Sequence, residues 1–95
     1  MNAVPERVRS LPGADLIARG LTDLNARRET TEALLVSIGA PRLRSLGCEV
    51  RLPFDSPEHR LYLRLAREKG NAAHSAYNAL IRRLVSFERA AQCAT

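Results

Sequence analysis

The sequence has few aromatic residues and few cysteines, and tryptophan is absent. Two tyrosines and two phenylalanines leave the core to be built from Leu, Ile, Val and Ala. Cys48 and Cys93 have neither the CxxC spacing nor the neighbouring histidines of a zinc site. We interpret them as reduced thiols, with a disulfide between them as the alternative. The sequence also has no phosphate-binding glycine loop, nucleophile motif or paired carboxylate, so it predicts no metal, no cofactor and no enzymatic activity.

Long apolar runs are missing as well. The longest strongly apolar run, residues 33–36, is far too short to cross a bilayer, and residues 1–7 lack the apolar segment of a secretory signal. The expectation is a cytoplasmic protein that has no membrane partner.

Positive charge is in moderate excess. The net charge is +5, and all but one of the fifteen basic residues are arginine. This balance favours an acidic partner such as nucleic acid, because guanidinium groups form bidentate contacts with phosphate. The alternative is compositional, since a GC-rich genome encodes arginine in preference to lysine. The charges are spread over both halves of the chain, and there is no basic tail.

The length of 95 residues and the hydrophobic content of 45% predict one folded domain. Residues 1–12 combine prolines and charges without a clear period, so we expect an N-terminal arm that is loose unless it docks. Residues 13–95 are expected to form a single helical domain. A chain this short buries a limited share of its surface, so self-association would stabilise it.

The strongest pattern runs from residue 57 to residue 91. At roughly 100° per residue, its apolar residues fall within an arc of about 200°. Lys69, Arg83 and Glu88 lie inside or at the edge of this arc, whereas Val85 falls on the polar side. Ser56 followed by Pro57 marks the start of a helix. Gly70 is the one position where the helix could break, but the pattern keeps its phase on both sides of Gly70, so we predict a continuous helix.

The length of this predicted helix bears on assembly. A helix of this span is about 50 Å long, whereas a compact domain of this size is roughly 30 Å across. The overhang and the wide apolar arc predict a homodimer or a higher oligomer. Two alternatives remain: the first half of the chain covers the whole apolar arc, or Gly70 breaks the helix. The predicted oligomer interface comprises Tyr77, Leu80, Ile81, Leu84 and Phe87.

Shorter helices are predicted in the first half of the chain, over residues 14–28, 30–38 and 41–46. Thr30 or Thr31 would cap the second of them, and Gly39 would end it. Asp15 with Arg19, and Asp23 with Arg27, are spaced as ion pairs along the first helix. The predicted fold is therefore all-α, a small helical bundle in which three short N-terminal helices pack on one long C-terminal amphipathic helix.

Residues 48–54 are expected to form an extended linker across the bundle. Its apolar residues Val50, Leu52 and Phe54 would point inward. Residues 31–46 have the outline of a helix-turn-helix, but the piece after the turn is too short to present several side chains to a major groove. A structural helical corner is the alternative.

Five arginines fall on the polar arc of the long predicted helix, where they would form a stripe able to follow a phosphate backbone. A solvated helix face is the alternative interpretation. The candidate nucleic-acid-binding residues are Arg60, Arg64, Arg67, Arg82 and Arg89.

Arg67 and His74 are seven residues apart on the same predicted helical face. This spacing resembles the Arg-(x)4-6-His element of the HEPN-type all-helical ribonucleases. The resemblance covers these two residues and implies ribonuclease activity, with His74 performing acid-base chemistry beside Asn71 and Asn78. The alternative is a surface histidine on a helix.

These patterns rank three functions. The leading hypothesis is a small interaction or adaptor protein that self-associates and could also bind another protein. The second is a helical regulator that binds nucleic acid through the arginine stripe. A HEPN-like ribonuclease is the third.

Overall fold

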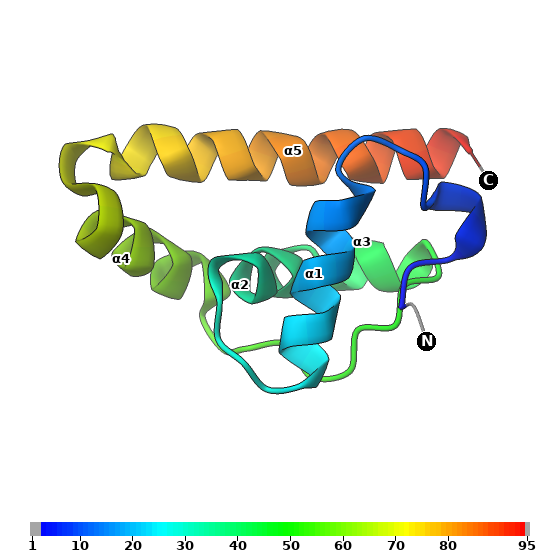
Figure 1. The fold of residues 1–95 in the computed structure, drawn as a ribbon, viewed down its shortest axis with the longest axis horizontal. Coiled ribbons are helices and arrows are strands. Elements are labelled where there is room, and N and C mark those ends of the chain that lie inside the picture. The colour runs from blue at the N-terminus through cyan, green and yellow to red at the C-terminus, as the bar shows by residue number, and fades with distance from the viewer. Residues whose placement is uncertain (1–2, 95) are drawn as a thin grey trace.

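The computed structural model describes residues 3–94, and all of its regular structure is helical (Figure 1). This part of the chain has no strand, which confirms the predicted all-α fold with a long C-terminal helix. The elements in chain order are the 3-10 helix η1 (Glu6–Val8), α1 (Ala14–Asn25), α2 (Thr31–Ile38), α3 (Ala40–Ser45), α4 (Pro57–Lys69), the 3-10 helix η2 (Gly70–Ala72) and α5 (Ala73–Cys93).

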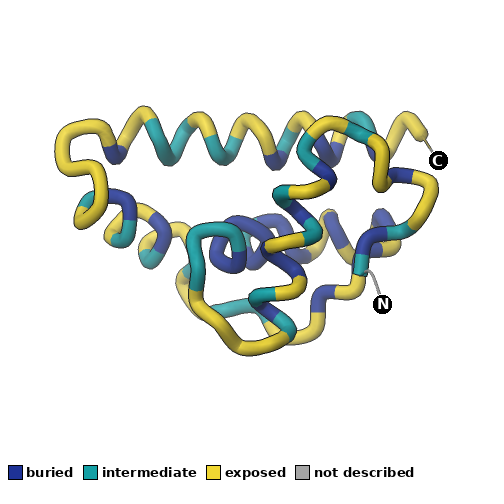
Figure 2. The backbone as a smooth tube through the Cα atoms, in the orientation of Figure 1, coloured by how far each residue is buried: buried dark blue, intermediate teal, exposed yellow. Residues whose placement is uncertain are grey.

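Helix α2 lies at the centre of the fold. It packs against α1, α4, α5 and α3, and every residue from Ala33 to Ser37 is buried (Figure 2). A helix that is apolar on all sides is stable only when it is surrounded in this way. The hydroxyl of Thr30 caps α2 by accepting a hydrogen bond from the Ala33 N–H at 3.1 Å, and Gly39 follows its last residue. Both of these predicted helix signals are confirmed.

A glycine allows α1 to cross α2 at close range. A Cβ atom at Gly20 would lie 2.4 Å from the carbonyl oxygen of Glu32 and 2.7 Å from Cγ1 of Val36. No larger residue fits here without a shift of one helix. The close crossing buries Ile17, Leu21 and Leu24 of α1 against α2.

The C-terminal region is a helical hairpin, so the prediction of one continuous helix over residues 57–91 is wrong. Helix α4 ends at Lys69, and Gly70 adopts φ +54° and ψ −120°, a conformation open to glycine because it lacks Cβ. Helix α5 then folds back over α4 (Figure 1). The centroids of the Tyr62 and Tyr77 rings, one from each helix, lie 5.9 Å apart. Because each helix buries its apolar face against the rest of the domain, the apolar pattern persists across the break.

The break also removes the predicted overhang. The described chain measures 38 × 24 × 18 Å, so it contains no helix of the predicted length of about 50 Å. Ser56 occupies the predicted N-cap position of α4, but it has φ +46° and its side chain makes no capping hydrogen bond. Pro57 begins the helix as predicted.

The linker between α3 and α4 is only partly inward-facing. Val50 is buried and Phe54 is half-buried, but Leu52 is 64% exposed, so the prediction that Leu52 points inward is wrong. The guanidinium of Arg27 lies 4.4 Å above the Phe54 ring and donates a hydrogen bond to the Leu52 carbonyl at 2.6 Å. These contacts fix the linker with Leu52 outside.

The end of α1 differs from the prediction in a related way. Helix α1 stops at Asn25, and Arg27 has φ +60°, so Arg27 no longer lies one helical turn after Asp23. Asp23 instead pairs with Arg28 at 3.0 Å. The predicted ion pair between Asp23 and Arg27 is therefore wrong.

The N-terminal segment is docked along the part that the structure describes. Val4 and Val8 are buried in the core, and the Glu49 N–H donates to the Ala3 carbonyl at 3.0 Å. Arg7 donates to the Leu46 carbonyl at 2.8 Å. Residues 1 and 2 of the predicted arm lie outside the described residues.

Both cysteines are free thiols. Cys48 is buried, and burial raises the pKa of its thiol, an effect that the positive charge of Arg7 partly offsets. Cys93 is exposed near the end of α5. Within residues 3–94, no helix combines the length and apolar character needed to span a membrane.

Candidate interaction groove

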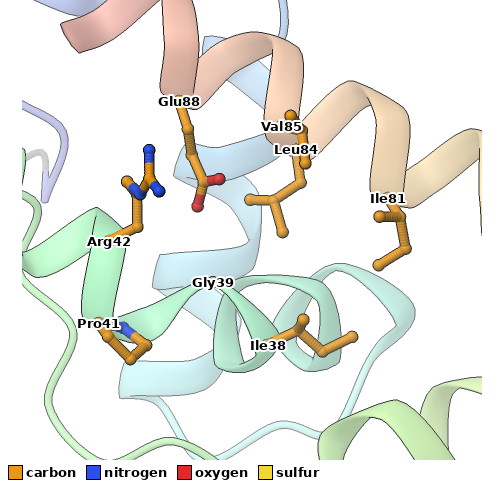
Figure 3. Close-up of a pocket in the computed structure, with 8 residues that line it drawn as sticks. All are labelled: Ile38, Gly39, Pro41, Arg42, Ile81, Leu84, Val85 and Glu88. Atoms are coloured by element: carbon orange, nitrogen blue, oxygen red, sulfur yellow. The ribbon is translucent and has the colours of Figure 1, made fainter.

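An open groove separates α5 from the junction of α2 and α3 (Figure 3). We call it the α5 groove, and its cavity volume is about 290 Å³. Most of its lining is aliphatic, with one acidic and one basic side chain. The residues that line it are Ile38, Gly39, Pro41, Arg42, Ile81, Leu84, Val85 and Glu88.

Gly39 sets the depth of the groove. A Cβ atom at this position would lie 2.9 Å from Oε2 of Glu88 and 3.0 Å from Cδ1 of Leu84. The absence of a side chain therefore lets α5 approach the α2–α3 junction. Leu84 is buried beneath the groove, whereas Ile81 and Val85 of α5 remain half-buried. Ile38 of α2, also half-buried, extends into the space below Ile81 and Leu84 (Figure 3).

Glu88 is the unusual residue of this site. It is 8% exposed, and its carboxylate has no hydrogen bond or ion pair with any residue in the described chain. Burial raises the pKa of this carboxyl, and the positive charge of Arg42 offsets part of that rise. In Figure 3 the carboxylate points into the space between α5 and α3, with the Arg42 side chain beside it.

One arginine lines the groove, and two more lie beyond Val85 on the solvent-facing side of α5. Arg82 and Arg89 lie one helical turn before and after Val85, on the same side of α5, and both are exposed. Neither makes a hydrogen bond or ion pair with the described residues. Arg42 of α3 is also exposed and donates a long hydrogen bond of 3.5 Å to Oε1 of Gln92. Arg42, Arg82 and Arg89 together form what we call the arginine rim.

The arginine stripe predicted on one long helix is divided between two helices, α4 and α5. Arg60 of α4 pairs with Glu29 at 3.0 Å. Arg64 donates to the hydroxyl of Thr31 at 3.1 Å and to the carbonyl of Glu29 at 3.2 Å. These two arginines tie α4 to the start of α2. Arg67 is exposed near the end of α4, far along the chain from the arginines of α5.

The predicted oligomer interface is also divided. Leu84 and Phe87 are buried in the core of their own chain, so their side chains are already covered. Tyr77, Leu80 and Ile81 are half-buried and pack against the core. Of these three half-buried residues, Ile81 lines the α5 groove.

The residues of the ribonuclease-like spacing do not share a helical face. Arg67 lies in α4, Asn71 in η2, and His74 in α5. Nε2 of His74 lies 3.2 Å from Nδ2 of Asn78, one turn along the same helix, and both of these groups are near the surface. The common face of Arg67 and His74 depended on a continuous helix, so that prediction is wrong.

The helix-turn-helix outline also lacks a recognition helix. Helix α3 has six residues, and Gly39 alone separates it from α2. The structural alternative, a corner between two short helices, matches this geometry.

Four residues departed from the predicted helix pattern, and two of them line the groove. Val85 fell on the polar arc and Glu88 at the edge of the apolar arc, and both line the groove. Arg42 and Ile38 gave no signal, because their position beside α5 depends on the hairpin at Gly70. Comparisons of the whole chain with protein-family models, with curated proteins and with solved structures give no match.

Proposed function

We propose that this protein is a protein–protein interaction module that binds a helix of its partner in the α5 groove. The observation that carries the proposal is an open, mainly aliphatic groove between two helical elements of the same domain. Grooves of this kind bind amphipathic helices through apolar side chains spaced by three or four residues.

The packing of α5 supports this proposal. Ile38, Ile81 and Val85 are only half-buried, although they line a continuous apolar surface over the buried Leu84. Each Å² of apolar surface that a partner removes from water contributes roughly 25 cal/mol. A docked helix would therefore gain affinity from residues that the domain leaves partly uncovered.

A second copy of the chain is another possible occupant. The overhang that predicted a homodimer is gone, but a second copy docked in the groove would cover the same half-buried residues of α5. Light scattering after size exclusion distinguishes a second copy from a different partner, because only the former changes the mass of the isolated protein.

A selection from a phage-displayed library of helical peptides tests the proposed function. We expect enriched sequences to carry apolar residues spaced by three or four positions. Val85→Arg, which places a charged side chain on the groove wall, should weaken their binding at least about tenfold. The matched control is Leu63→Arg, because Leu63 is 42% exposed on α4 and does not line the groove.

The proposal is wrong if no peptide is enriched, or if the enriched peptides bind the Val85→Arg variant as tightly as the wild type. Circular dichroism of both variants would show that the fold is intact.

A further inference from the structure

Resting on the proposed function, we infer that the partner segment is an acidic amphipathic helix. Its apolar side chains would contact Ile38, Ile81 and Val85, and its carboxylates would pair with the arginine rim.

The charge distribution on α5 supports an acidic partner. Arg82 and Arg89 lie one turn on either side of Val85, a residue of the groove wall, and neither is bonded to an acidic residue of the described chain. On another side of the same helix, Arg83 and Arg19 line a hollow together with Asp15 and Glu32, so two acidic side chains face two basic ones there. Arg82 and Arg89 line no such hollow with acidic side chains, so a partner helix that docks against Val85 could form bidentate pairs with them through its carboxylates.

A second copy of the chain complements this surface poorly. Two grooves facing each other would bring two arginine rims together, with only the Glu88 carboxylates as acidic groups from the groove linings. Like charges in one interface oppose association. The net charge of +5 adds to this repulsion.

Nucleic acid also fits less well than an acidic helix. Sequence-independent binding of single strands uses aromatic side chains on which bases stack, and the groove lining contains none. Glu88 points into the groove and would repel a phosphate backbone. An acidic helix can avoid this repulsion by placing a hydrogen-bond donor opposite Glu88 and its carboxylates one turn away, at Arg82 and Arg89.

Three versions of one selected peptide test the inference. They share the same apolar positions, and their solvent-facing positions carry Glu, Gln or Lys. Fluorescence anisotropy gives each affinity at low and at physiological ionic strength. We expect the Glu version to bind at least about tenfold more tightly than the Gln version at low salt, and the Lys version to bind least. The advantage of the Glu version should shrink as salt is raised.

Variants of the protein show which arginines cause the preference for the Glu peptide. The double variant Arg82→Glu, Arg89→Glu should remove the preference for the Glu peptide and still bind the Gln peptide. The control is Arg67→Glu, because Arg67 is an exposed arginine of α4 outside the groove. This variant should keep the preference for the Glu peptide.

The outcomes separate the inference from the function on which it rests. Equal binding of the Glu and Gln peptides, both weakened by Val85→Arg, would overturn the acidic partner and leave the interaction module intact. Failure of all three peptides to bind would overturn the proposed function itself. A single-stranded oligonucleotide that displaces the Glu peptide and depends on Arg82 and Arg89 would identify nucleic acid as the occupant, and a dimer dissociated by Val85→Arg would identify a second copy. Either result would overturn the inference.

Discussion

Helices α2 and α5 differ in how much of their surface is buried inside the domain. Helix α2 has eight residues, five of them buried, and neighbouring helices surround it. Helix α5 has 21 residues, and its buried residues are Ala73, Leu84, Phe87, Glu88 and Ala91. In Figure 2, α2 is a nearly unbroken buried segment, whereas exposed and half-buried residues alternate along α5.

This difference assigns the two helices different roles: α2 contributes mainly to stability, and α5 keeps apolar surface that a partner could bind. A helix that is covered on all sides leaves no apolar surface for a partner. A helix packed along one side keeps half-buried residues at the edge of that packing, and in α5 these residues line the groove. The first half of the chain thus forms the centre of the core, and the helix that follows Gly70 forms the candidate binding surface.

The largest expected effect comes from truncating a side chain of α2. Leu35 is fully buried, so Leu35→Ala should lower the free energy of unfolding by about 2–5 kcal/mol. Ile81→Ala on α5 should cost about 1 kcal/mol or less, because Ile81 is half-buried. Urea unfolding of both variants measures the difference. Equal losses would show that α5 contributes to the core as much as α2 does.

Adding a methyl group where α1 crosses α2 should be the next most damaging change. In Gly20→Ala the new Cβ would meet the backbone of Glu32, which cannot move without displacing a helix. We expect a loss of about 1–3 kcal/mol or more, measured by thermal unfolding. Alanine normally favours a helix over glycine, so a stabilised variant would contradict this close crossing.

A substitution at Gly70 tests the hairpin without any steric clash. A Cβ atom there would have no neighbour within 4 Å, so Gly70→Ala acts only through the backbone. Holding an L-residue at φ +54° should cost about 1–3 kcal/mol. Thermal unfolding measures this loss, and D-alanine, which accepts positive φ, is the matched control and should restore stability. A longer particle in small-angle X-ray scattering would instead mean that Gly70→Ala joins α4 and α5 into one helix.

Local sequence signals predicted the short helices well. Thr30 and Gly39 bound α2 as expected, because a capping hydroxyl and a glycine act within a few residues of their own position. The all-α fold followed from the helical period of the apolar residues, which the helix packing preserves.

The hairpin and the groove could not be predicted from local patterns. The apolar phase continues through Gly70 because α4 and α5 both bury their apolar faces, so periodicity cannot distinguish one helix from two. The approach of Arg42 to Glu88 depends on that fold-back and on the missing side chain of Gly39. Two of the four residues out of phase with the helix pattern, Val85 and Glu88, belong to the site, and the pattern did not distinguish them from Lys69 and Arg83.

The smallest expected effect concerns the buried carboxyl of α5. Burial raises the pKa of Glu88 above its ordinary value of 4.5, so the folded state binds the proton more tightly than the unfolded state does. Stability associated with this proton is present at acid pH and is lost as the pH rises through the folded-state pKa. Glu88→Gln should therefore unfold like the wild type below pH 4.5 and be more stable at neutral pH.

The gain should be no more than about 1 kcal/mol, because Arg42 offsets part of the cost and the groove is open to solvent. Urea unfolding over a pH series measures it, with Glu6→Gln as a control at an exposed acid of η1. If Glu88→Gln destabilised the protein at neutral pH, the ionised carboxylate would be a stabilising partner of Arg42.

This result bears on the comparison of the two helices. The buried polar group of α2, the Ser37 hydroxyl, both donates and accepts a hydrogen bond, whereas the Glu88 carboxylate of α5 does neither within the described chain. If the ionised carboxylate of Glu88 lowers the stability of the free protein, a hydrogen-bond donor on a docked partner would offset that cost.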